Sequence, residues 1–283
     1  MSSQFPESGW NKIIINDHDA LNKANDQLHH ASQFLAIIGK NLIPQKPDDS
    51  NTNIGIIAGG LIGRKVEGSK SFHAFIDIPG FTLNLIDPSM SRISTIDLDG
   101  KNRDEALEEL RNSVNQIGLD GSLLKNIDHY TIDKDHPIQQ GATFQKPDEE
   151  ALRTWHSLYS NARFVMRHAS KAFESADEIR IWPHHFDIGT YIPLNEEGSK
   201  AIGMGLAIPD SVVNDFYFYI YGWQRDVVID LSKFTPLSVG EWKTGDWNGG
   251  ALPVSVLISR EDQSVKASEF FMESINEFLK VLQ

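Results

Sequence analysis

The chain contains no cysteine among its 283 residues. Disulfide bonds, thiol nucleophiles and cysteine-ligated zinc are therefore excluded. No apolar run approaches the roughly 20 residues that a membrane-spanning helix needs. The first residues also lack the basic start and the apolar segment of a secretory signal. We therefore expect a cytoplasmic protein without a membrane partner.

Clusters of basic residues are absent as well. The chain has 26 lysines and arginines against 39 aspartates and glutamates, a formal net charge of −13. Its basic residues are scattered, and Arg64-Lys65 is the only adjacent pair. This balance argues against nucleic acid as a partner, because phosphate backbones are bound by concentrated positive charge.

Helical periodicity appears in four places. Apolar residues recur at helical spacing over residues 17–38, with Asn16 or Asp17 as the N-cap and Gly39 as the stop. Asn102 and Glu105 match a capping box that opens a second helix. Pro147 is a suitable start for a third, long helix, and the chain ends in a helix that is rich in phenylalanine and leucine.

Short segments between these helices read as strands. Closely spaced strands without intervening helices favour antiparallel pairing. The predicted strands are residues 54–58, 72–78, 81–86, 92–98, 127–132, 178–182, 185–192, 201–208 and 215–223.

The order of helix, strands and helix therefore occurs twice along the chain. It predicts an α+β fold of two similar halves, each a mainly antiparallel sheet with packed helices, as in a tandem pseudo-repeat. We expect residues 1–283 to form a single unit, with the first half at 1–120, a connector at 121–146 and the second half at 147–283.

Strand alternation gives the second half a candidate binding face. If the bulky aliphatic residues share one side of the sheet, the other side has a floor without side chains at Gly203 and Gly205. Glycines inside strands often mark a place where something approaches the backbone closely. This arrangement predicts a ligand groove, whereas the alternative is that the helix from Pro147 covers the same face. The predicted ligand-binding residues are Trp182, Tyr217, Tyr219, Tyr221, Trp223, Gly203 and Gly205.

The segment Trp182-Pro-His-His-Phe-Asp187 lies at one end of this face. On a strand, His185 and Asp187 point to the same side and could form an acid–base pair, while His184 points to the other side. A metal site would need a third ligand, for which His73, Asp77, His156 and His168 are available. No HxxxH or HExxH spacing is present, and His29 and His30 diverge on their helix, so we predict no metal site.

The same segment resembles a protein family that is known only as a domain of unknown function. Members of that family share a WPHHFD-like segment, here Trp182 to Asp187, and a later tyrosine-rich strand, here Tyr217 to Tyr221. Looser similarity extends over most of the chain, at residues 33–40, 60–61, 75–77 and 252–253. The resemblance implies that the two halves belong together, but it implies no activity, cofactor or catalytic residue.

Two classes of function follow from these residues. The first is a small-molecule-binding protein that uses the tyrosine-rich face, with His185 and Asp187 as polar anchors. The second is an enzyme of hydrolase type in which Asp187 orients a histidine, His185 or His184, that acts as general base, with or without a metal. The sequence names no cofactor and no oligomeric state.

Overall fold

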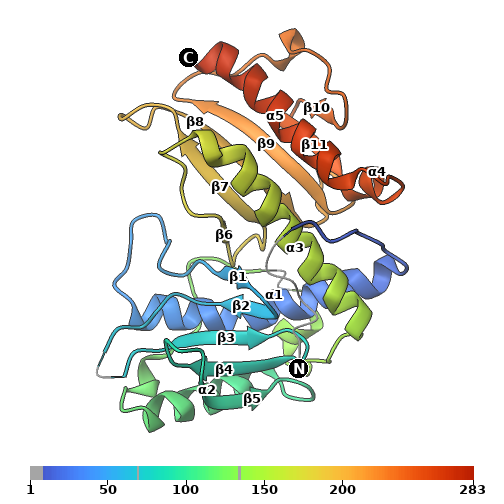
Figure 1. The fold of residues 1–283 in the computed structure, drawn as a ribbon. Helices are drawn as coiled ribbons and strands as arrows, with labels where there is room; N and C mark the ends of the chain where they lie inside the picture. The colour runs from blue at the N-terminus through green and yellow to red at the C-terminus, as the bar shows by residue number, and fades with distance from the viewer. Residues whose placement is uncertain (1–8, 69, 133–134) are drawn as a thin grey trace. The chain divides into compact units, whose positions relative to one another are not determined.

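The computed structural model describes residues 9–68, 70–132 and 135–283. Residues 1–8 lie outside this part of the chain, and the predicted absence of a secretory signal concerns these residues. Residues 133–134 also lie outside it. The fold is α+β, with one five-stranded and one six-stranded antiparallel sheet (Figure 1). None of the helices in the described part of the chain has the length and hydropathy needed to cross a bilayer.

The chain divides into two compact units that interleave along the sequence. The first unit contains residues 15–156 and 181–185, and the second contains residues 9–14, 157–180 and 186–283. The division therefore falls inside the long third helix rather than in a connector at 121–146. Each unit has an antiparallel sheet and helices of its own, in agreement with the predicted fold class.

The first unit contains a five-stranded meander in the order β1-β2-β3-β4-β5 (Figure 1). Leu83 and Leu85 on β4 are buried and alternate with Asn84, whose side chain bonds Thr95 on β5. The elements are α1 (His18–Leu42), β1 (Gly55–Ile57), β2 (Gly60–Ile62), β3 (His73–Asp77), β4 (Thr82–Ile86), β5 (Arg92–Asp97), α2 (Arg103–Gln116) and two short 3-10 turns, η1 (Gly121–Leu123) and η2 (Pro137–Gln140).

N-capping residues that are recognisable in the sequence set the starts of α1 and α2. Asp17 caps α1 by accepting from the Ala20 N–H at 2.9 Å, and the predicted capping box of Asn102 and Glu105 is present at α2. The prediction that α1 stops at Gly39 is wrong, because the helix continues to Leu42. Gly39 is instead a packing position, since a Cβ there would lie 2.3 Å from the Asn51 carbonyl oxygen.

Two strand assignments in this unit need correction. Residues 60–62 form β2, which pairs with β1 across a two-residue turn where Gly59 has φ of 75°. This glycine-rich stretch is thus a hairpin, as glycine at positive φ permits. Residues 127–132, predicted as a strand, are irregular, and Tyr130 is tied to Gln33 of α1 by its hydroxyl instead of by a strand partner.

The second unit contains the six-stranded sheet, in the order β10-β11-β9-β8-β7-β6. Strands β10 and β11 were not predicted, because they are short and β11 begins with two glycines that show no alternation. The remaining elements of the chain, of which α3 and β6 each belong partly to the first unit, are α3 (Glu149–Ala169), η3 (Ser170–Ala172), β6 (Arg180–Ile181), β7 (Ile188–Pro193), β8 (Lys200–Ala207), β9 (Tyr217–Gln224), η4 (Leu231–Lys233), β10 (Glu241–Lys243), β11 (Gly249–Pro253), α4 (Val254–Ile258) and α5 (Gln263–Leu282).

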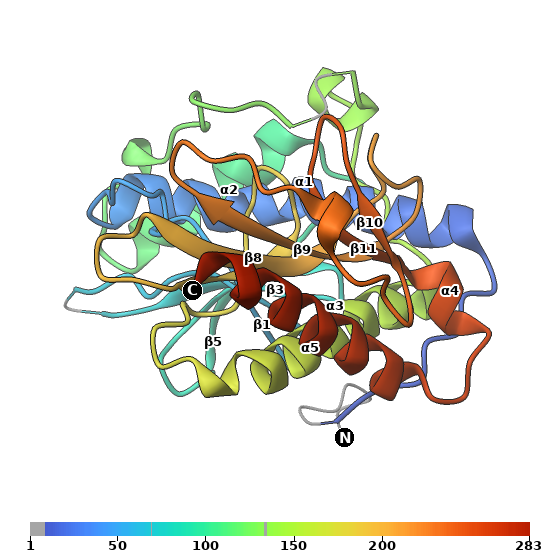
Figure 2. The same ribbon diagram turned by 90° about the horizontal axis from the view of Figure 1, so that it is seen from above.

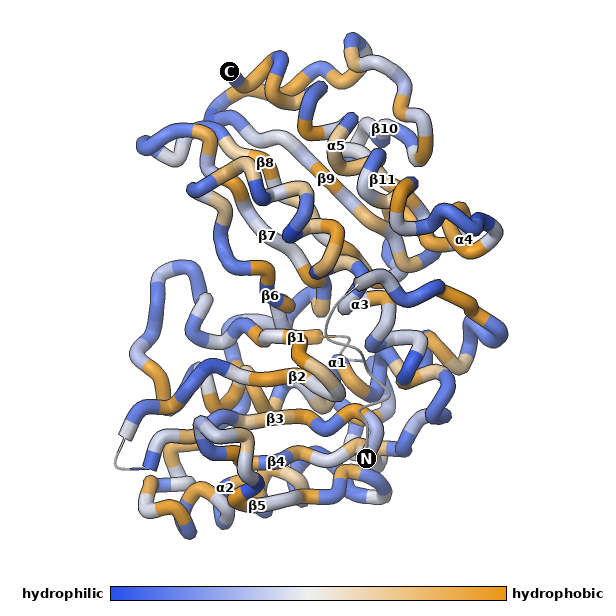
Figure 3. Tube along the Cα trace, viewed as in Figure 1, coloured by the Kyte–Doolittle hydropathy of each residue, from blue (hydrophilic) through white to orange (hydrophobic). Residues whose placement is uncertain are grey.

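Helix α5 covers the aliphatic face of this sheet. Its apolar stripe, visible as orange segments along its trace in Figure 3, places Phe271 edge-on against Phe218, with ring centroids 5.9 Å apart. A Cβ at Gly222 of β9 would lie 2.4 Å from the Phe278 ring, so the helix approaches the strand closely. Figures 1 and 2 show residues 157–169 of α3 on the same face of the sheet as α5.

Candidate functional site

The segment 183–185 is a turn, not the start of a strand. Strand β6 ends at Ile181 and β7 begins only at Ile188, so the predicted strand over residues 185–192 starts three residues too early. Phe186 has φ of 57°, a left-handed conformation that is uncommon for a bulky side chain. Its ring is fully buried against Tyr159, and its carbonyl oxygen accepts a 2.5 Å hydrogen bond from the Tyr159 hydroxyl.

This turn changes the relations predicted from alternation. The rings of His184 and His185 do not point to opposite sides of a sheet; their centroids are 4.3 Å apart. His185 is the last residue of the first unit's segment, whereas Asp187 belongs to the second unit. The acid–base pair of His185 and Asp187 therefore stays a prediction. Trp182, also predicted to bind ligand, lies in the first unit, with its ring 6.2 Å from that of His184.

The tyrosines of β9 share one face of the six-stranded sheet with the glycines of β8, as alternation predicted. Tyr219 pairs with Gly205, and Tyr221 pairs with Gly203. We call this side of the sheet the aromatic face. The registers place these side-chain positions on it: Gly189 and Tyr191 on β7; Ala201, Gly203, Gly205 and Ala207 on β8; Tyr217, Tyr219, Tyr221 and Trp223 on β9; Gly249 and Ala251 on β11.

The glycines are covered by the tyrosine rings themselves. A Cβ at Gly203 would lie 2.3 Å from the Tyr221 ring, and one at Gly205 would lie 2.5 Å from the Tyr219 ring. The two rings are stacked, with centroids 6.4 Å apart and planes inclined by 17°. The prediction of an open glycine floor with tyrosines along its border is therefore wrong. The rings of Tyr219 and Tyr221 lie flat over Gly205 and Gly203. Both rings are partly exposed, and Trp223 is 38% exposed.

The alternative that the helix from Pro147 packs on these glycines is wrong for this unit. That helix begins at Glu149, and Asp148 caps it by accepting from the Glu150 N–H at 2.8 Å. Its part in the second unit lies with α5 over the aliphatic face (Figures 1 and 2).

Two carboxylates accept hydrogen bonds from tyrosine hydroxyls of the aromatic face. Asp187 accepts from the Tyr219 hydroxyl at 2.5 Å, and Asp210 accepts from the Tyr217 hydroxyl at 2.8 Å. Burial raises the pKa of the Tyr219 phenol well above its usual value, and the Asp187 charge raises it further. Burial also raises the pKa of Tyr221, and the neighbouring Tyr191 and Asp187 raise it further. These phenols are thus neutral donors at physiological pH.

In the first unit, helix α1 holds the turn at Pro183. The Pro183 carbonyl oxygen accepts from His29 Nε2 at 2.9 Å and from Gln33 Nε2 at 2.8 Å. The Gln33 amide oxygen in turn accepts from the Tyr130 hydroxyl at 2.9 Å, and the Tyr130 ring lies 5.6 Å from that of His184. Sequence reasoning missed this set. The spacing of four residues between His29 and Gln33, which places both on one side of a helix, was the available signal.

Several histidines lie in or near this turn. His29 and His30 diverge as predicted, His29 toward Pro183 and His30 toward His136, whose ring centroid is 4.3 Å away. Burial lowers the pKa of His29 to about 4, and the neighbouring histidines lower it further against the effect of the Pro183 carbonyl. Burial, and then His136, His29 and Arg103, lower the pKa of His30 to about 3. Both imidazoles are therefore neutral near pH 7.

The further metal ligands considered from the sequence serve other roles. His73 Nδ1 donates to the Gly63 carbonyl at 3.0 Å, and His156 Nε2 donates to the Ile57 carbonyl at 2.9 Å. Asp77 forms an ion pair with Arg92 at 3.1 Å. Within the described part of the chain, no three histidine, aspartate or glutamate side chains are grouped so that they could hold a metal ion.

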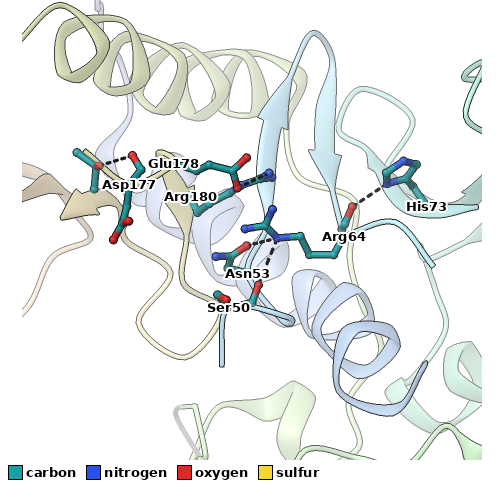
Figure 4. A network of polar contacts seen from close by, with 9 residues as sticks. Ser50, Asn53, Arg64, His73, Asp177, Glu178 and Arg180 are labelled. Atoms are coloured by element: carbon teal, nitrogen blue, oxygen red, sulfur yellow. Dashed lines mark hydrogen bonds and ion pairs between the residues drawn. The ribbon is translucent and has the colours of Figure 1, made fainter. Parts of the chain in front are cut away.

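Arg64, half of the only adjacent basic pair, is held by the backbone and side chains of the first unit. Figure 4 shows its Nε donating to the Asn53 side chain at 2.8 Å and to the Ser50 carbonyl at 3.2 Å. These bonds anchor the loop between α1 and β1 to the second residue after β2. Arg64 thus has a structural role in the first unit.

Comparison with known proteins adds no relative. The chain matches no protein-family model, no curated protein and no solved structure.

Proposed function

We propose that the second unit binds a small planar molecule on the aromatic face. The observation that carries this proposal is the stacked pair of Tyr219 and Tyr221, whose partly exposed rings lie 6.4 Å apart on a floor of glycines. Flat aromatic rings offer large apolar area at low conformational cost, and they stack on other planar groups. Trp223 extends this surface at the exposed end of β9.

The hydrogen-bonding groups of the face favour a ligand that carries an acceptor. The hydroxyls of Tyr217 and Tyr219 are used by Asp210 and Asp187. The hydroxyls of Tyr191 and Tyr221 form no hydrogen bond with any described residue, and neither is a buried unpaired atom. These two phenols therefore remain available as donors to a carbonyl or hydroxyl oxygen of a bound molecule.

The charges on the face favour a neutral ligand. Glu241 and Lys243 of β10 pair with each other at 2.8 Å, and the two aspartates each accept from a tyrosine. A charged ligand would have to compete with these local partners. We therefore propose a neutral conjugated molecule with at least one oxygen acceptor.

The test uses 2-naphthol as a probe, titrated into the full chain and followed by isothermal titration calorimetry. We expect saturable binding that weakens at least tenfold in Tyr221→Ala and in Trp223→Ala. Phe164→Ala is the matched control, because Phe164 is a 42% exposed aromatic residue of α3 away from this face. Equal affinity in all four proteins, or no saturable binding to the wild type, would refute the proposal.

The hydrolase alternative needs His185 and Asp187 to act together on one substrate. These residues belong to different units, and Asp187 already accepts from Tyr219. No observation favours this alternative over ligand binding. It remains a hypothesis from the sequence.

A further inference from the structure

Arg103 in the first unit carries a positive charge that forms no ion pair with any carboxylate of the described residues. Arg103, the first residue of α2, donates from Nη1 to Gln139 Oε1 at 2.6 Å and from Nη2 to Asn126 Oδ1 at 3.3 Å. Both acceptors are neutral amides. Arg103 forms no ion pair with any described carboxylate, and its Nε is buried without a hydrogen-bond partner. Arg103 is partly buried, and a guanidinium that is partly removed from water is stabilised by a nearby anion.

A second unpaired nitrogen lies in the same group of residues. The His30 side chain is 3% exposed, and its Nδ1 has no hydrogen-bond partner among the described residues. Its ring lies 4.3 Å from that of His136, and Arg103 is close enough to lower the His30 pKa. Two orphaned buried nitrogens in one cluster are unusual, since nearly all buried polar atoms in native proteins are paired.

His136 supplies a third donor to this cluster. It caps the 3-10 turn η2, where its Nδ1 accepts from the Ile138 N–H at 3.3 Å. Because Nδ1 is the acceptor, the neutral ring carries its proton on Nε2. Two carboxylates lie next to the cluster in sequence, Asp104 after Arg103 and Asp135 before His136, and both are exposed, while His29 is neutral near pH 7.

We propose that Arg103, His30 and His136 form a binding site for a small oxyanion, the phosphate or carboxylate group of a ligand. Arg103 Nε–H, His136 Nε2–H and, in its neutral Nδ1–H tautomer, His30 would donate to its oxygens, and the guanidinium would gain an anion in direct contact. The site lies entirely in the first unit. It is therefore independent of the aromatic face, and either proposal can fail without the other.

The experiment titrates the full chain at pH 7 with sodium phosphate and, separately, with sodium acetate, at ionic strength held constant with sodium chloride. Calorimetry reports the affinity. We expect saturable binding of at least one anion, weakened at least tenfold in Arg103→Gln and in His136→Asn. If Arg103→Gln does not fold, His136→Asn still tests the site. Asparagine is a good N-cap residue, so this variant should keep η2 folded.

Arg167→Gln is the control, since it removes the same charge from an exposed position in the second unit. Binding of phosphate alone assigns the site to phosphate groups, and binding of acetate alone assigns it to carboxylates. The proposal is overturned if the wild type binds neither anion with saturation. It is also overturned if Arg103→Gln and His136→Asn bind as tightly as the control.

Discussion

The hydroxyl of Tyr219 donates a 2.5 Å hydrogen bond to the carboxylate of Asp187, which joins the middle of β9 to the residue just before β7. The bond crosses the central strand β8 above Gly205, whose missing side chain leaves room for the Tyr219 ring. It therefore fixes both the tilt of the ring and the position of Asp187.

Removal of the Tyr219 hydroxyl should destabilise the protein. Tyr219→Phe removes the hydrogen bond from the Tyr219 hydroxyl to the Asp187 carboxylate, and hydrogen bonds to charged groups contribute about 1.5–3 kcal/mol. We expect a loss of this size in urea unfolding. Tyr221→Phe is the matched control, because the Tyr221 hydroxyl bonds no described residue. Equal stability of the two variants would contradict the structural role of the bond.

A side chain at Gly205 should displace the tyrosines. In Gly205→Ala the Cβ would lie 2.4 Å from the Ile188 carbonyl oxygen and 2.5 Å from the Tyr219 ring, distances that require the backbone and the ring to move. Overpacking of this kind typically costs about 1–3 kcal/mol. Urea unfolding measures the loss, and near-ultraviolet circular dichroism measures the rearranged tyrosines.

Gly68→Ala is the control for this substitution. A Cβ at Gly68 meets no atom within 4 Å, and its φ is not in the left-handed region. We expect this variant to keep the wild-type stability and spectrum. If Gly205→Ala behaved in the same way, the close approach of the Tyr219 ring to β8 would be wrong.

The parts of the fold that could be predicted are those set by neighbours in sequence. The capping box at Asn102 and the two faces of β8 and β9 follow from local patterns, and both are present. The stop at Gly39 was wrong because a segment 12 residues away sets the need for glycine there. The turn before β7 was missed because strand alternation does not anticipate a left-handed Phe186, which buried contacts with Tyr159 hold in place.

The same distinction between local and distant residues decided which parts of the candidate sites could be predicted. Its tyrosine and glycine pattern was readable, since it lies on two adjacent strands. The basic cluster was not, because Arg103, His30 and His136 come from three separate segments of the chain. Similarly, 154 residues separate His29 from Pro183, and no local pattern links them.

The bridge from Tyr130 through Gln33 to Pro183 should behave as one cooperative network. Gln33 both accepts from Tyr130 and donates to the Pro183 carbonyl, so Gln33→Met breaks both bonds of the bridge whereas Tyr130→Phe breaks one. Gln33→Met also removes the longer local bonds of Gln33 Nε2 to the His29 carbonyl and to Ser32 Oγ. We expect destabilisation of roughly 2 and 1 kcal/mol, and a non-additive double variant with a coupling of at least about 0.5 kcal/mol. Unfolding of the two single variants and the double variant measures this coupling, and strict additivity would contradict the bridge.

The buried neutral His30 predicts that the protein loses stability on mild acidification. Its pKa is about 3 in the folded chain and 6.5 when unfolded, so below pH 6.5 the unfolded chain binds one more proton than the folded chain. Stability is therefore highest above pH 6.5 and falls as the pH decreases toward 3, by about 2 kcal/mol for this group between pH 7.5 and 5. Urea unfolding across that range should show a shallower pH dependence in His30→Gln, while His168→Gln, at an exposed position, keeps the wild-type slope. An identical slope in His30→Gln would mean that His30 is not held neutral by burial.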